Sequence, residues 1–154
     1  MPKILDGFSV SGTFTFASGT YFTPSYASTI AQVASGGNYT LRPDRVFSQP
    51  ISGPGSSALW FNNSAFTAPT SPSGYGTASR NSIEGPGTVS MNMSLARTQS
   101  FGGTKSFEAR VTANNAFNTV QYAGINTVLN SATFGRVTST ASPRQLTVQA
   151  RYRF

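Results

Sequence analysis

The side chains that perform most protein chemistry are nearly absent from this sequence. It contains no cysteine and no histidine, which excludes disulfide scaffolds, thiolate or imidazole metal sites and nucleophiles activated by histidine. Only four acidic residues remain for acid-base chemistry, and they are scattered along the chain: Asp6, Asp44, Glu84 and Glu108. The sequence therefore predicts a protein that is not an enzyme and has no catalytic residues, no metal site and no cofactor.

Basic residues outnumber acidic ones, which raises the question of an anionic partner. Lys and Arg together number 11 and Asp and Glu number 4, so the formal net charge is +7. Nucleic-acid-binding proteins usually gather such charges into a patch or stripe. Here they are spread singly through the chain, as at Arg42, Arg80, Arg110 and Arg144. This distribution argues against nucleic acid as a partner.

The composition favours strands and turns. Charged residues make up 10% of the chain, against about 25% in typical soluble domains. Phe (12) and Tyr (6) supply most of the aromatic residues. No stretch approaches the roughly 20 apolar residues of a membrane helix, and the residues after Met1 contain no apolar run of signal-peptide length. A membrane strand needs only about 10 residues of alternating pattern, so a membrane protein is still compatible with this composition.

The strongest pattern lies at the carboxy terminus, in residues 145–154. Apolar side chains alternate strictly with polar ones there, as one-sided burial of a β-strand requires. One face carries Leu146, Val148, Ala150, Tyr152 and Phe154, and the other carries Gln145, Thr147, Gln149, Arg151 and Arg153. Chain ends usually fray, so a well-patterned strand that ends on an aromatic residue calls for an explanation.

Three further segments alternate in the same way, and we expect strands at about 8–16, 89–97 and 106–114. The second and third are joined by Phe101-Gly-Gly-Thr-Lys105, in which Gly102 and Gly103 can adopt the positive backbone angles of a tight hairpin turn. The sequence thus predicts an all-β fold, an antiparallel meander of about four long strands.

Two long connections separate these strands, at about 17–87 and 115–143. Both are rich in Gly, Pro, Ser, Thr and Asn, which is typical of turns and loops. Short hairpins could form around Tyr21-Phe22 or Ala58-Leu59-Trp60-Phe61. We expect one very long and one medium irregular loop, and we treat residues 1–154 as a single, incomplete barrel segment.

The order of connections, very long, very short and long, suits an outer-membrane barrel, which has long outside loops and short periplasmic turns. Four strands cannot close such a barrel, because open edges would leave backbone groups unpaired in lipid. We therefore expect this chain to be a piece of a larger barrel or an oligomerising unit. A soluble four-stranded sheet is the competing interpretation, but its apolar face would need a covering layer.

Several short motifs recur in an order and at intervals that resemble one family. They are Gly7-Phe8, Ala17-Ser18-Gly19, Arg42-Pro43-Asp44-Arg45-Val46, Trp60-Phe61-Asn62, Ala65-Phe66, Arg80-Asn81-Ser82, Gly85-Pro86-Gly87, Phe107-Glu-Ala-Arg110, Asn115-Ala-Phe-Asn118, Gly124-Ile-Asn-Thr127, Phe134-Gly-Arg136, Pro143-Arg-Gln145 and Arg151-Tyr-Arg-Phe154. Over nearly its whole length the chain resembles the carboxy-terminal barrel segment of a TonB-dependent outer-membrane receptor of the Oar-like type, whose members begin with a carboxypeptidase-regulatory-like domain.

The resemblance implies a fragment of a transport protein in the outer membrane of a Gram-negative bacterium, made as part of a longer precursor with a signal peptide. Its partners would be outer-membrane lipid, the barrel-assembly machinery and the remainder of the receptor barrel and plug, with TonB acting only through the missing plug. Leu146, Val148, Ala150, Tyr152 and Phe154 would form the terminal assembly signal. The chain departs from the family at Thr119-Val120-Gln121-Tyr122, where many members have a turn that contains histidine.

Aromatic residues in the long loop suggest a second role. Trp60, Phe61, Phe66 and Tyr75 are candidate ligand-facing residues, and Tyr21 could join them in a sugar- or ligand-stacking surface, since exposed aromatic rings bind ligands well. Packing within the loop or an interfacial aromatic girdle is the favoured interpretation. Glu108 and Arg110 are expected to form an ion pair on the polar face with Arg151 or Arg153. The alternative function is a secreted or surface-exposed β-rich binding module of the adhesin type, which should be soluble without detergent.

Overall fold

The computed structural model describes residues 6–27, 40–70 and 75–154. The chain divides into two compact units, which we call the sheet unit (residues 1–17, 88–121 and 142–154) and the loop unit (residues 18–87 and 122–141). Sequence analysis treated both connections as loops of a single segment. Most of their residues do lie outside regular strands, but they fold around a core of their own.

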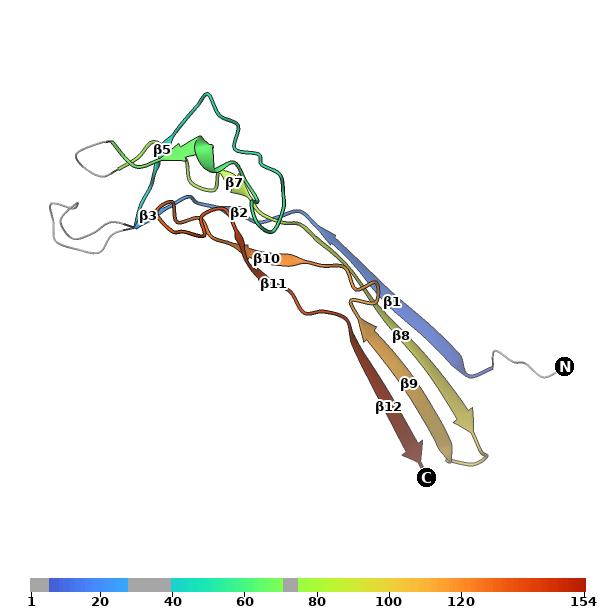
Figure 1. Ribbon diagram of the computed structural model, residues 1–154. Helices are drawn as coiled ribbons and strands as arrows, with labels where there is room; N and C mark the ends of the chain where they lie inside the picture. Colours follow the sequence, from blue (N-terminus) through green and yellow to red (C-terminus); the bar gives the residue numbers. More distant parts are fainter. Residues whose placement is uncertain (1–5, 28–39, 71–74) are drawn as a thin grey trace. The chain divides into compact units, whose positions relative to one another are not determined.

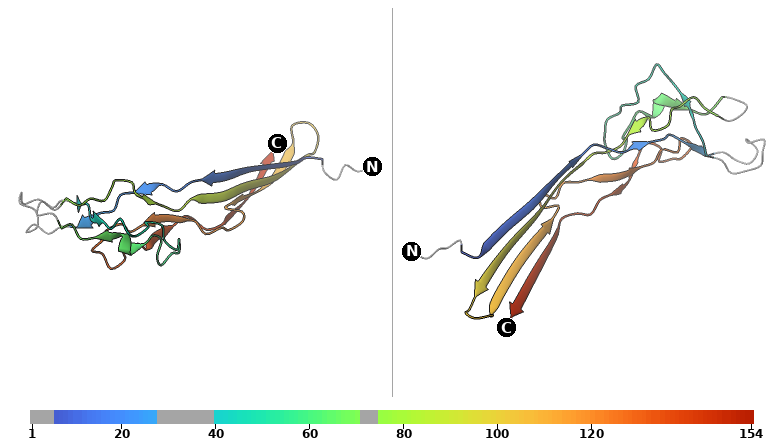
Figure 2. Two further views of the ribbon diagram at one scale, coloured as in Figure 1. Left: turned by 90° about the horizontal axis from the view of Figure 1, so that it is seen from above. Right: turned by 180° about the vertical axis from the view of Figure 1, so that it is seen from behind.

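The sheet unit consists of the four strands expected from the alternating pattern. They are β1 (Phe8–Ala17), β8 (Thr88–Ser100), β9 (Ser106–Asn114) and β12 (Gln145–Arg153). All neighbours are antiparallel, in the order β1-β8-β9-β12, and the strands run side by side in every view (Figures 1 and 2). The predicted all-β meander is confirmed, with β8 extending beyond its predicted end at Arg97 to Ser100.

A tight turn joins β8 to β9 at one end of the sheet. Gly102 and Gly103 have φ angles of 92° and 60°, values that residues with a Cβ rarely adopt. The amide of Phe101 donates a hydrogen bond to the carbonyl oxygen of Lys105 at 3.0 Å. At the other end of the sheet, Ala17 pairs with Thr88 and Asn114 pairs with Gln145. Both long connections therefore leave from the end opposite the Gly102-Gly103 turn.

The end of β9 is closed by a turn at Asn115–Asn118. The Asn115 side chain is buried, and it bridges the turn by accepting from the amide of Thr119 at 3.1 Å and donating to the Thr119 carbonyl at 3.0 Å. The Asn115 amide donates to the side chain of Asn92 on β8, and the Asn118 side chain accepts from the amide of Arg144 before β12. This turn thus ties β8, β9 and the entry to β12 together.

The loop unit contains only short elements. They are β2 (Tyr21–Phe22), β3 (Tyr26–Ala27), β4 (Thr40–Leu41), β5 (Asp44–Arg45), the 3-10 helix η2 (Asn63–Ala65), β6 (Phe66–Thr67), β7 (Ile83–Glu84), β10 (Tyr122–Ile125) and β11 (Val137–Thr140). They form the two-stranded pairs β2–β7, β3–β4, β5–β6 and β10–β11. Tyr21–Phe22 is therefore a strand, but its partner lies far along the chain instead of in a local hairpin.

Three phenylalanine rings form the centre of the loop unit. Phe61, Phe66 and Phe134 meet edge to face, with ring centroids separated by 5.1 to 6.3 Å. The backbone reinforces this contact, because the Trp60 amide donates to the Gly135 carbonyl at 2.8 Å and the Asn63 side chain donates to the Phe134 carbonyl at 2.9 Å. Residues of the long connection are thus packed against residues of the second connection.

Charged side chains of Arg42-Pro43-Asp44-Arg45-Val46 fasten the surrounding loops. Arg42 donates to the carbonyl of Ala78 at 3.0 Å, and Arg45 donates to the carbonyls of Ala65, Val46 and Gln49. Pro43 between them is fully buried. Each guanidinium satisfies carbonyl oxygens that irregular backbone would otherwise leave without partners. We call residues 42–46 the loop clamp.

The acidic residue of the loop clamp binds backbone donors. The carboxylate of Asp44 accepts from the amide and hydroxyl of Thr70 at 2.8 and 2.7 Å, and from the amide of Thr77 at 2.9 Å. These hydrogen bonds, led by that from the Thr70 amide, hold the pKa of Asp44 below its ordinary value of 3.8. They favour the ionised carboxylate.

We expect Asp44→Asn to lower the stability of the loop unit at neutral pH. Because the pKa of Asp44 is lower in the folded than in the unfolded state, its stabilisation is present above pH 3.8 and is lost as pH falls through the folded-state pKa. Trp60 is the only tryptophan of the chain and lies in the loop unit. Its fluorescence reports thermal unfolding and can be recorded from neutral pH to about pH 2. The unsubstituted chain should lose stability in acid, and Asp44→Asn should lose less because it lacks the carboxylate. Asp6→Asn, in the sheet unit, is the charge-matched control, and an equal pH response in both variants would contradict this role.

Candidate functional site

The register of the sheet unit gathers the apolar side chains on one face. Each strand pairs with its neighbour without a shift, so residues in register point to the same face. The apolar face, as we call it, carries Phe8, Val10, Gly12, Phe14 and Phe16 of β1, Val89, Met91, Met93 and Leu95 of β8, Phe107, Ala109, Val111 and Ala113 of β9, and Leu146, Val148, Ala150 and Tyr152 of β12. These are the faces that the alternation predicted.

The apolar face has the height of a membrane barrel. From Val89, which pairs with Phe16, to Gln99, which pairs with Phe107, β8 rises about 34 Å at roughly 3.4 Å per residue. A strand tilted by about 40° would then cover a band about 26 Å tall, close to the roughly 25 Å of outer-membrane barrels. The band has aliphatic rows in its middle, such as Val10, Leu95, Val111 and Val148.

Nothing in the described part of the chain covers this face, and most of its large side chains are exposed. A contiguous apolar surface of this size marks contact with another apolar phase. Arg97 projects from the same face, in the row between Leu95 and Gln99, with its guanidinium carbon 5.0 Å from the centre of the Phe8 ring. A long basic side chain can keep its apolar stem against such a surface and extend its charge toward water.

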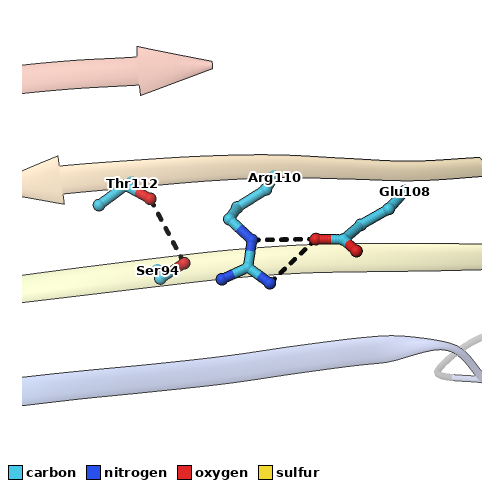
Figure 3. A network of polar contacts seen from close by, with 4 residues as sticks. All are labelled: Ser94, Glu108, Arg110 and Thr112. Atoms are coloured by element: carbon cyan, nitrogen blue, oxygen red, sulfur yellow. Dashed lines mark hydrogen bonds and ion pairs between the residues drawn. The ribbon is translucent and has the colours of Figure 1, made fainter. Parts of the chain in front are cut away.

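The opposite face is mostly polar. Figure 3 shows the Arg110 guanidinium against the Glu108 carboxylate at 2.9 Å, and the hydroxyls of Ser94 and Thr112 at 3.5 Å. The predicted partner of Glu108 was wrong: it pairs with Arg110 of its own strand, although Arg151 lies directly opposite. Residues two apart share a face, and the long Arg110 side chain can fold back along the strand. Both groups are partly exposed, so the pair contributes little to stability.

The two outer edges of the sheet are open within the described residues. β1 pairs only with β8, and β12 pairs only with β9. A hollow at the polar face is lined by Arg110 of β9 and by Arg151 and Arg153 of β12, among others. Unpaired strand edges cost several kcal/mol per backbone group in hydrocarbon, so both edges require partners in a membrane.

The structure separates the four candidate ligand-facing aromatics. Phe61 and Phe66 are 2% and 5% exposed and pack in the core of the loop unit, so neither ring is available at its surface. Hydrophobic transfer draws these rings into the apolar core of the loop unit. Trp60 is partly buried beside a hollow, and Tyr75 is exposed at a different hollow.

The sequence did not predict that Tyr21 and Glu84 meet at the same hollow as Trp60. They come together because β2 pairs with β7. Two-residue strands give no alternation to detect, and the segments are far apart in the sequence. The only available signal was the aromatic pair Tyr21-Phe22 within otherwise polar residues.

Residues 6–27, 40–70 and 75–154 contain neither a group of side chains that could hold a metal ion nor a helix that could span a membrane. The apolar face and the hollow beside Trp60 are thus the features that carry functional information.

Comparison with protein families gives a match over residues 1–147 to the outer membrane beta barrel domain. The chain belongs to this outer-membrane β-barrel family. Membership indicates an outer-membrane location, in which the apolar face is the lipid-facing surface and the polar face lines the barrel. Neither the curated proteins nor the solved structures gave a significant match.

A positive charge in the middle of the apolar face should weaken membrane insertion of this barrel segment. Val10 lies in a central row, and Val10→Arg should cost about 2–4 kcal/mol at the bilayer midplane. Ser11→Arg places the same side chain on the polar face of the same strand and should have little effect. Flotation of the refolded chain with phospholipid vesicles, in increasing urea, measures the difference. Equal loss of flotation in both variants would contradict the assignment of the faces.

Proposed function

We propose that this chain is the carboxy-terminal part of a TonB-dependent outer-membrane receptor of a Gram-negative bacterium. It contributes four membrane strands, the loops between them and a terminal assembly signal to a transporter barrel. The observation that carries the proposal is the apolar face, which continues in register across all four strands and is exposed.

The connections support the same assignment. In outer-membrane barrels the turns on the periplasmic side are short and the loops on the outside are long. The Gly102-Gly103 turn lies at one end of the sheet and both long connections leave from the other. With the turn on the periplasmic side, both long connections leave the sheet on the extracellular side.

The motifs that resemble the receptor family have structural roles that fit a barrel with folded outer loops. Arg42–Val46 forms the loop clamp, Phe61 and Phe134 meet in the core of the loop unit, and Asn115–Asn118 closes the end of β9.

The open edges of β1 and β12 support an origin in a larger barrel. Strands from the remainder of the receptor would pair with both edges, satisfying the backbone groups that lipid cannot. The plug would occupy the barrel interior, which this chain lines with its polar face. Coupling to TonB would act through that plug and not through residues of this segment.

The sequence of the gene around the Met1 codon tests the receptor assignment. We expect an open reading frame that continues upstream and encodes further alternating strands, a plug domain, a carboxypeptidase-regulatory-like domain and a signal peptide. An upstream frame that encodes strands but no plug would contradict TonB-dependent transport. It would leave intact the membership in the outer-membrane barrel family, which is shown independently.

The apolar side of the terminal strand is the part of the chain expected to act as the assembly signal. On β12, Leu146, Val148, Ala150 and Tyr152 share the lipid-facing side, and the Tyr152 and Phe154 rings stack with centroids 6.5 Å apart. Replacing Tyr152 and Phe154 with Ser in a receptor that carries this end should strongly reduce the amount of folded barrel in the outer membrane, because recognition by the assembly machinery is lost. Heat-modifiable migration on gels measures the folded fraction.

Thr147→Ser and Gln149→Ser provide controls on the polar side of the same strand. Their side chains face away from lipid, so we expect normal assembly. Unchanged assembly after the loss of both aromatics would refute the signal, and impaired assembly in the controls would indicate a general defect in β12.

A further inference from the structure

A hollow of about 400 Å³ opens on the loop unit between three segments that are distant in the sequence. Its lining includes aromatic, carboxylate and hydroxyl groups, from Tyr21, Ser52, Trp60, Ser82 and Glu84. The volume lies within the range of small-molecule sites, which are about 300–1,000 Å³. The combination of residues, and not the size alone, indicates what the hollow would bind.

Pairing of β2 with β7 places a ring and a carboxylate side by side. Tyr21 lies directly opposite Glu84 in the antiparallel register, so both side chains leave the same face of this ribbon. Their neighbours Phe22 and Ile83 point to the other face, where Ile83 is fully buried and Phe22 packs against the core. Burial of that face therefore fixes Tyr21 and Glu84 on the outer one.

Trp60 is held rigidly at the same place. Its indole nitrogen donates to the backbone carbonyl of Glu84 at 2.8 Å, and its ring meets that of Tyr122 edge to face at 5.9 Å. The indole is thus fixed against β7 on one side and β10 on the other. An aromatic ring that is already ordered loses little conformational entropy when a ligand stacks on it.

Polar groups around the rings are free to bind. Among the described residues, the Glu84 carboxylate takes part in no ion pair. The Ser82 hydroxyl is buried and has no hydrogen-bond partner in the same part of the chain, a state that is uncommon in folded proteins. Ser52 adds a second, exposed hydroxyl to the lining.

We propose that this hollow is a binding site for a neutral pyranose sugar. The C–H faces of a sugar ring stack on aromatic side chains, while its hydroxyls donate to carboxylates and exchange hydrogen bonds with serine. An anionic ligand would be repelled by Glu84. A cationic ligand would make little use of the two serine hydroxyls. It would also be repelled by the net charge of +7 on the protein.

The proposal goes beyond the receptor assignment and does not depend on it. A saccharide could bind the loop unit whether or not the barrel transports it, and the test below measures binding alone. The sugar could belong to a free oligosaccharide or to the carbohydrate of a surface glycolipid, since both present the same ring.

Fluorescence of Trp60 provides the readout, because it is the only tryptophan of the chain. The refolded full-length chain in a polyoxyethylene detergent, which carries no sugar headgroup, is titrated with soluble neutral hexasaccharides of glucose, galactose and mannose. A parallel titration uses glycolipid micelles. We expect a saturable change at millimolar concentration with at least one hexasaccharide or with the micelles, and the arm that responds identifies the source of the sugar.

Two substitutions locate the site. Tyr21→Ala removes the exposed ring, and Glu84→Gln removes the charge but keeps the backbone carbonyl that holds Trp60. Each should weaken binding roughly tenfold or more, with an unchanged Trp60 emission in the absence of sugar as evidence of folding. Tyr75→Ala is the matched control, since Tyr75 is 67% exposed against 57% for Tyr21 and lies at another hollow of the same unit.

Three outcomes would overturn the proposal. They are the absence of a response to every hexasaccharide and to the glycolipid micelles, binding that Tyr21→Ala leaves unchanged, and a response to tetramethylammonium that Glu84→Gln abolishes while sugars give none. The last result would assign the hollow to a cation.

Discussion

The sheet depends on one constraint, the unshifted antiparallel register of β1, β8, β9 and β12. Side chains alternate between faces with a period of two, so a slip of one residue at any pair would turn a whole strand over. Arg110 and Glu108 would then face lipid, and Val111 would face the polar side. The register keeps the charged side chains on the polar face and the apolar side chains on the face that meets lipid.

The ends of the sheet are where this register is set. Gly102 and Gly103 permit a turn that brings Ser100 opposite Ser106. At the other end, the buried side chain of Asn115 closes a turn by binding the backbone of Thr119, and the Asn115 amide donates to the side chain of Asn92 on β8. Residues at the turns, which contribute nothing to the apolar face, therefore decide which residues form it.

The loop unit is held together differently, because its strands are short and paired only in twos. Its stability rests on three phenylalanine rings and on the charged side chains of the loop clamp, which bind backbone groups of irregular segments. A loop held in this way can present rigid groups at its surface. Trp60 illustrates this, since the residue that follows it, Phe61, lies in the core while the indole is fixed at the hollow.

The sequence by itself determined the four long strands, their faces and the hairpin turn, because alternation and glycine pairs are local signals that lipid and backbone geometry impose directly. It also excluded sites built on cysteine or histidine, because neither residue occurs in the chain. Only the tertiary structure decided which loop aromatics are buried, that Glu108 pairs with Arg110, and that Tyr21, Trp60 and Glu84 meet. Those contacts join segments that are distant in sequence or depend on the path of one long side chain, and no local pattern encodes either.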